Sequence, residues 1–288
     1  MDNATKLTDS VLLTLEVRIW CPSKKIDADD TNTMVGKTKL LIPQSAVGCI
    51  SSIGSAMRTY TGAKTLPFPV RGVHRLPNGM VERYDEHMSD MKIDFDAAVD
   101  EFVYGTGYFN ARRQAEEILG DLYDENDYPE ADRLRSRFGA VWTYFQIGGP
   151  GDSVGVLSGG TMQKRIAEFN AMITQAEQDA VAFLRSRFTE MLSRVAGNLS
   201  DPGKKFKNSS IETFQDFLDD FALLNVAGDR DLAALVDRCK QHMSGVDPQT
   251  FRDDDMFRSQ VGRQMNIVAG TVNRMFGTGL RRIVRAQS

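Results

Sequence analysis

A regular apolar seam between residues 162 and 183 constrains the fold of this chain more than any other feature. Its members are spaced alternately four and three residues apart: Met162, Ile166, Phe169, Ile173, Ala176, Ala180 and Phe183. This spacing places them on one stripe of a helix and is typical of helices that pack along one another. With a phase shift the pattern continues to Gly197, which predicts a helix about 50 Å long. Such a helix needs a long partner, so we predict an antiparallel helical hairpin built from residues 94–120 and 161–196.

The first 90 residues follow a different period. Residues 10–21, SVLLTLEVRIWC, alternate between two faces, as a strand with one buried face does. KTKLLIP at 37–43 predicts a second short strand, and Pro43 opens a predicted helix that runs to about residue 58. Asn78 and Gly79 tolerate positive φ and lie between two semi-alternating runs, which predicts a β-hairpin. This part of the chain is therefore expected to be a small α+β region.

Helical periods dominate the rest of the chain. Apolar spacing predicts the 94–120 helix, weakened in its middle by Gly105 and Gly107, and a second helix over residues 134–145. Asp127 and Glu130 resemble a capping pair before that second helix. Shorter helices are predicted at 211–226, at 230–243 and after Pro248.

The predicted fold class is mainly α, with a small α+β N-terminal part, a long antiparallel helical hairpin and C-terminal helices. We expect three regions: an α+β region at 1–92, the hairpin at 93–200, and a C-terminal helical region with a basic tail at 201–288.

Composition narrows the class of protein. The chain is 41% hydrophobic and 26% charged, as ordinary soluble globular proteins are. No apolar run approaches the ~20 residues of a membrane helix, and no secretory signal is recognisable at the start. The three cysteines are too few and too scattered for a disulfide framework or a zinc knuckle. We therefore expect a cytoplasmic protein with reduced thiols and no membrane partner.

The stretch LSGGTMQKR at 157–165 differs by one letter from the LSGGQ signature of ATP-binding-cassette ATPases. That signature acts together with a Walker A loop, and the only GKT in the chain, Gly36 to Thr38, has Thr31 where the first glycine should stand. No apolar strand ends in an acidic pair. We interpret Ser158 or Thr161 as the N-cap of the long helix, and nucleotide binding stays only as an unfavoured alternative.

No other motif points to catalysis or to a cofactor. The sequence contains no G-x-S-x-G nucleophile elbow, and no cysteine has the context of a reactive thiolate. His74 and His87 lie among acidic residues, but they lack the spacing of a metal-ligand pair on a helix. Solvated charges explain these histidines and their acidic neighbours better than a metal site does. Because no catalytic motif is present either, we expect no metal, no cofactor and no enzymatic activity.

Charge is segregated toward the C-terminus. From Met256 to Ser288 there are no acidic residues and six arginines, so residues 1–255 carry −10 against a total of −4. Two interpretations stay open: the tail folds back on the acidic body, or its arginines bind phosphates or an acidic partner. If they bind, the candidate site consists of Arg274, Arg281, Arg282 and Arg285.

One stretch resembles a known family. The run at 95–139, with Tyr128, Pro129, Leu134 and Phe138, is similar to the bacterial and phage family catalogued as domain of unknown function 3150. The order of elements over residues 10 to about 200 fits the same family. The family has no established activity, so no functional residue carries over to this chain. Its members are encoded in phages and mobile elements, often near an AAA+ ATPase of the MoxR or cobaltochelatase type, which implies an accessory role.

These observations lead to two expected functions of different classes. The first is a non-enzymatic adaptor of a phage or mobile element, in the bacterial host cytoplasm, that engages an AAA+ ATPase or another protein through its helices. The second is a nucleic-acid-binding accessory factor that uses the arginine-rich tail. The oligomeric state does not follow from the sequence.

Overall fold

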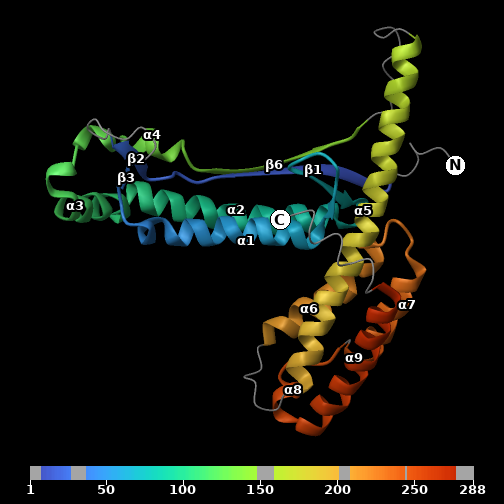
Figure 1. Ribbon diagram of the computed structural model, residues 1–288. Coiled ribbons are helices and arrows are strands. Elements are labelled where there is room, and N and C mark those ends of the chain that lie inside the picture. The colour runs from blue at the N-terminus through green and yellow to red at the C-terminus, as the bar shows by residue number, and fades with distance from the viewer. Residues whose placement is uncertain (1–7, 27–36, 148–158, 201–207, 244, 277–288) are drawn as a thin grey trace. The chain divides into compact units, whose positions relative to one another are not determined.

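The computed structural model describes residues 8–26, 37–147, 159–200, 208–243 and 245–276 (Figure 1). The chain divides into two compact units, which are interleaved along the sequence. The first, here called the bundle unit, comprises Met1–Leu12, Ala63–Met80 and Phe145–Ser288. The second, here called the α/β unit, comprises Leu13–Gly62 and Val81–Tyr144.

The predicted N-terminal strands are confirmed. β1 (Ser10–Arg18) corresponds to the alternating run, and β3 (Lys37–Leu40) pairs antiparallel with β2 (Ser23–Ile26). A 3-10 turn, η2 (Gln44–Val47), follows Pro43 and leads into helix α1 (Gly48–Lys64). Within the α/β unit α1 packs closely on β1 and the residues after it, because a Cβ at Gly54 would lie 3.0 Å from Val17 Cγ1 and Ile19 Cδ1.

The predicted hairpin at Asn78 and Gly79 is wrong. β5 (Val73–Pro77) ends there in a 3-10 turn, η3 (Asn78–Met80), and the chain continues as helix α2 (Val81–Tyr104). The antiparallel partner of β5 is the preceding strand β4 (Leu66–Pro67). The main sheet has the strand order β4-β5-β1-β6, so β5 lies between two strands that come before it in the chain.

The predicted helix at 134–145 is also wrong in most of its length. Helix α4 (Ala131–Arg135) is a short turn, and strand β6 (Gly139–Phe145) follows it. The sequence GAVWTYF is rich in β-branched and aromatic residues, which suit a pleated strand better than a helix. β6 runs beside β1, and Figure 1 shows both strands extending along α1 and α2 of the α/β unit.

The glycines at 105 and 107 interrupt the predicted 94–120 helix. Helix α2 ends at Tyr104, and helix α3 (Gly107–Leu119) begins three residues later. The turn between them is tight, since a Cβ at Gly105 would lie 2.4 Å from the carbonyl oxygen of Glu101. A side chain at that position is therefore excluded on steric grounds.

The long seam forms one continuous helix, as predicted. Helix α5 (Gly159–Ser200) spans 42 residues in the bundle unit. The helices that follow it in the same unit are α6 (Asn208–Leu224), α7 (Arg230–Met243), α8 (Thr250–Asp253) and α9 (Asp255–Phe276).

The partner of the long helix differs from the prediction. Helix α9 lies antiparallel to α5: Asn266 donates to Ser200 Oγ at 2.7 Å, while Phe276, ten residues later, lies under the Arg185 guanidinium, fifteen residues before Ser200. The 94–120 segment belongs to the α/β unit instead. An antiparallel helix pair is therefore present, but its second member is α9.

The fold class is as predicted: the chain is mainly helical, with a small antiparallel sheet formed largely by its N-terminal part. The boundaries of the compact units differ from those of the three predicted regions. The predicted hairpin region, 93–200, is divided: residues 93–144 belong to the α/β unit and residues 145–200 to the bundle unit. Within the described ranges, no helix is long and apolar enough to span a bilayer.

Candidate interaction surfaces

The predicted arginine site falls largely outside the described residues. Arg281, Arg282 and Arg285 all lie beyond residue 276, where the description ends. Arg274 is exposed near the end of α9 and folds along its own helix, with Nε 3.4 Å from the Gly270 carbonyl oxygen and Nη2 3.3 Å from Thr271 Oγ1. The structure thus places one of the four arginines on a surface and leaves the prediction of a shared site untested.

The outer side of α9 is nevertheless distinctive. Its exposed residues include Arg263 and Arg274, and the helix contains no acidic side chain after Asp255. Met256 and Ile267, 81% and 62% exposed, lie on the same side. This surface is therefore positive and apolar together. The sequence predicted the positive charge of this segment, but it did not predict that two large apolar side chains on the same side face solvent.

A second exposed surface is the N-terminal end of α5. Ile173, Ala176 and Ala180 of the seam are buried, at 0–1% exposure. One helical turn earlier the seam is open, because Ile166 is 37% exposed and both Met162 and Phe169 are only half-buried. Figure 1 shows this end of α5 extending past the other described helices of the bundle unit. The apolar stripe therefore continues beyond the core that it helps to form.

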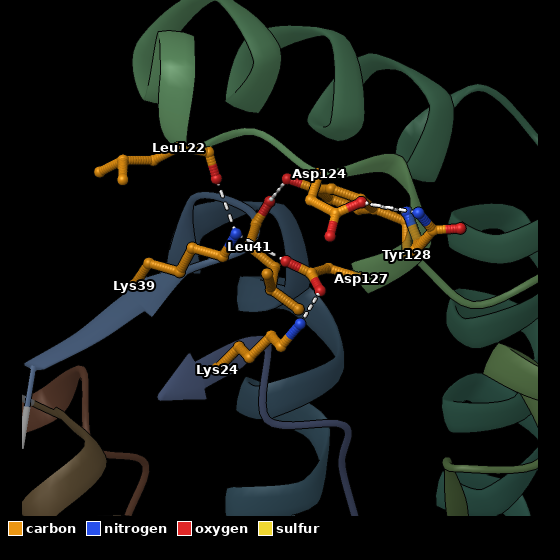
Figure 2. Close-up of polar contacts among 8 residues, drawn as sticks. Lys24, Lys39, Leu41, Leu122, Asp124, Asp127 and Tyr128 are labelled. Atoms are coloured by element: carbon orange, nitrogen blue, oxygen red, sulfur yellow. Dashed lines mark hydrogen bonds and ion pairs between the residues drawn. The ribbon is translucent and has the colours of Figure 1, made fainter. Parts of the chain in front are cut away.

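A buried carboxylate joins the β2–β3 ribbon to the 3-10 turn η5 (Glu125–Asp127) (Figure 2). The side chain of Asp127 is 2% exposed and pairs with Lys24 and, at 2.6 Å, with Lys39. Burial raises the pKa of Asp127, but the hydrogen bonds and charges of the two lysines outweigh this effect, so its pKa is lowered. The side chain that resembled half of a capping pair is therefore an ion-pair centre.

The same region contains further contacts that fix the turn. Lys39 also donates to the Leu122 carbonyl oxygen at 2.6 Å, and Tyr128 donates to the Leu41 carbonyl oxygen at 2.7 Å (Figure 2). Asp124 caps η5 by accepting from the Asn126 backbone at 3.0 Å. Each of these polar side chains has a partner within the fold, so the cluster is best explained as structural.

Another carboxylate orders the side chains of β6. Asp85 on α2 accepts from Trp142 Nε1 at 2.8 Å and from the Tyr144 hydroxyl at 3.0 Å. Burial, together with the hydrogen bond and charge of Asp85, raises the pKa of Tyr144. Trp142 and Tyr144 therefore point toward the helices, which leaves Val141 and Thr143 on the outer face of the strand.

The structure accounts for the histidines of the N-terminal half by packing. His74 is half-buried beside Thr65, with 3.3 Å between Nδ1 and Oγ1, and burial lowers its pKa. The His87 ring lies against Tyr60, with 4.0 Å between ring centroids. The described residues contain no group of three or more His, Cys, Asp or Glu side chains that could hold a metal ion.

Two further sequence candidates have structural explanations. The LSGGT stretch meets the start of α5, which begins at Gly159, while Ser158, one proposed cap, lies outside the described residues. Thr161 lies inside the first turn rather than before it. Burial raises the pKa of Cys239 to about 12, so this thiol is held protonated and unreactive.

An open acidic hollow was not anticipated as such. Glu212, Asp216 and Asp219 on α6 line it together with Asp247 from the turn after α7. The turn that completes the hollow could not be placed from local sequence patterns, because Asp247 comes close to α6 only in the folded chain.

Comparisons with known proteins add no relative. No protein-family model matches the chain, and no curated protein or solved structure matches it either.

Proposed function

We propose that this protein is a non-enzymatic adaptor that binds another protein through the N-terminal end of α5. The observation that carries the proposal is the continuation of the seam past the core, with Met162, Ile166 and Phe169 at least partly open. Apolar side chains at i, i+4 and i+7 on a rigid helix are the recognition pattern of helix-in-groove and coiled-coil partners.

The charge around this stripe suits a partner helix. Arg165 and Glu168 lie on one side of the stripe and pair with each other at 2.7 Å, so their charges largely cancel. A neutral, apolar surface gains most of its binding free energy from burial rather than from ion pairs.

The partner class comes from the family resemblance. A similarity to phage and mobile-element proteins encoded near AAA+ ATPases points to an ATPase of the MoxR or cobaltochelatase type, in the cytoplasm of a bacterial host. The proposed role is therefore to couple such a motor to its target, with the ATPase supplying all nucleotide chemistry.

The test compares two substitutions that add the same charge. Ile166→Glu places a carboxylate on the open stripe, whereas Ala171→Glu places one at an exposed position on the opposite side of α5. Pull-down and titration with AAA+ ATPases from the same genome should show binding by the wild type and by Ala171→Glu. Ile166→Glu should bind at least about tenfold more weakly, because it replaces an interface anchor with a charge. Equal binding by both variants would refute the use of this surface.

The outer side of α9 favours a second candidate, a nucleic-acid-binding accessory factor. Arg263 and Arg274 are exposed there without a neighbouring acidic residue on the helix. Salt-dependent DNA binding that weakens when both arginines become alanine would support it. The salt slope should then fall by about 0.7–0.9 for each phosphate that the variant no longer neutralises. Absence of salt-sensitive binding by the full chain would eliminate this candidate.

A further inference from the structure

Strand β6 occupies an edge of the main sheet. In the strand order β4-β5-β1-β6, β1 lies on one side of β6, and no strand of the described ranges lies on the other. An edge strand presents a row of backbone N–H and C=O groups that can pair with another strand. Natural sheets usually block such edges with proline, lysine, a bulge or a very short strand.

The other edges of this protein carry such protection. β4 (Leu66–Pro67), the opposite edge of the main sheet, is only two residues long. It contains Pro67, and Pro69 follows two residues later, so neither position has an N–H to donate. The β2–β3 ribbon has strands of four residues, and lysines make up half of them. These edges are poor templates for a further strand.

β6 has none of these features. It is seven residues long, and from Gly139 to Ile147 the sequence GAVWTYFQI contains no charge and no proline. Its outer-face residue Val141 is 51% exposed, and Thr143 next to it is also exposed. On the helix-facing side Trp142 and Tyr144 remain half-buried although Asp85 holds both in place. The open edge therefore offers backbone groups and aromatic surface together.

We infer that β6 pairs antiparallel with β6 of a second copy of this chain, which extends the sheet across a two-fold axis at Trp142. This register uses the whole strand and forms about six to eight backbone hydrogen bonds. It also matches side chains by size. Ala140 lies opposite Tyr144 of the other copy, and Gly139 lies opposite Phe145, so small residues make room for large ones.

The outer face has the same complementarity. In this register Val141 lies opposite Thr143 of the other copy, an uncharged pair of β-branched residues. Because the pairing is two-fold symmetric, this pair occurs twice, and no like charges face each other anywhere along the strand. An unrelated peptide would fit beside β6 only if its side chains happened to suit those of β6 at each of these positions. A second copy of β6 has suitable side chains at all of them.

The register gives a sharp test with two variants at the same positions. Val141→Lys with Thr143→Lys puts lysine opposite lysine in both symmetric pairs. Val141→Lys with Thr143→Glu puts lysine opposite glutamate in both. Both variants alter exposed side chains only, so both are expected to fold, which circular dichroism checks.

The measurement is sedimentation equilibrium of the full chain from about 1 to 100 µM, a range that brackets weak specific dimers. The wild type should approach twice its 32.1 kDa mass. The lysine–lysine variant should dissociate at least about tenfold more readily, and the lysine–glutamate variant should remain a dimer. A wild type that is monomeric throughout overturns the inference, as does a dimer that both variants leave intact or both disrupt.

Hydrogen exchange provides an independent readout. Amide protons of β6 that point away from β1 should become protected as the concentration rises, and the lysine–lysine variant should lose that protection. Dimerisation without added protection in β6 would assign the contact to another surface and overturn the inference.

Discussion

Gly262 of α9 lies so close to Leu199 of α5 that a Cβ added to the glycine would be 3.1 Å from Leu199 Cβ and 3.3 Å from its carbonyl carbon and oxygen. The glycine therefore sets how closely these two long helices of the bundle unit approach. Because backbone atoms form part of the contact, a rotamer change of Leu199 alone cannot relieve it.

Gly262→Ala should destabilise the bundle unit by about 1–3 kcal/mol, since the two helices must separate slightly. Gly270→Ala on the same helix is the matched control, because nothing lies within 4 Å of its added Cβ. That change should stabilise the protein by about 0.5–1 kcal/mol through helix propensity alone. Urea unfolding followed by far-UV circular dichroism measures both. A stabilising effect of equal size at both glycines would contradict the close packing.

Removing Asp229 from its ion pair with Arg185 should be strongly destabilising, because the arginine would lose its partner. Two hydrogen bonds of 2.6 and 3.0 Å join them, and Asp229, with a side chain only 4% exposed, also accepts from the Leu232 backbone at 3.1 Å. Asp229→Ala removes the partner of Arg185 and the cap of α7, and should cost about 3 kcal/mol. Glu190→Ala, which breaks the exposed pair with Arg194, should cost less than about 0.5 kcal/mol. Urea unfolding of both variants measures the difference, and comparable destabilisation in the two would contradict this account.

Asp127 should make the stability of the α/β unit depend on acid pH. Its pKa is lowered by Lys24 and Lys39 against the effect of burial, so its contribution is full above the unfolded value of about 3.9. That contribution is lost as the pH falls through the lowered folded pKa. Asp127→Asn should cost about 2 kcal/mol at pH 7, and the difference from wild type should shrink below about pH 4. Tryptophan fluorescence reports on this unit, because Trp20 and Trp142, the two tryptophans of the chain, both belong to it.

Tyr84 should affect stability at alkaline pH. The Thr61 hydroxyl donates to the Met57 carbonyl oxygen at 2.9 Å, so the Tyr84 hydroxyl donates to Thr61 at 2.8 Å. Burial raises the pKa of Tyr84 to about 12. Its contribution is therefore full below the unfolded pKa of about 10 and is lost as pH rises through about 12. Tyr84→Phe should cost about 1–2 kcal/mol at pH 7 and make stability fall less steeply between pH 10 and 12. An unchanged slope would refute the assignment.

The LSGGT stretch should have no part in nucleotide chemistry of the isolated chain. An added Cβ at Gly160 meets nothing within 4 Å, so Gly160→Ala should leave the fold intact and strengthen the start of α5 slightly. Calorimetric titration with ATP should show no binding by the wild type or by the variant. ATP binding by the wild type that disappears in the variant would overturn this prediction.

Local patterns predicted those elements whose apolar residues follow one clear period along the sequence. The seam from Met162 to Phe183 has one helical period throughout, and β1 has the period of a strand, so each is found where it was predicted. The segment at 139–145 carries apolar or aromatic residues at nearly every position, which suits a strand or a buried helix equally. β1 decides between them, because it offers β6 a row of backbone hydrogen-bond partners.

The sequence by itself determined that α5 is one long helix with an apolar stripe, because a helical period is a property of neighbouring residues. Only the tertiary structure decided that α9 is its partner and that the stripe runs past the core at Ile166. The choice of partner depends on close approach at Gly262, far away in the chain, and on which side chains remain uncovered after packing. The open edge of β6 belongs to the same class of feature, since an edge exists only once every other strand has been placed.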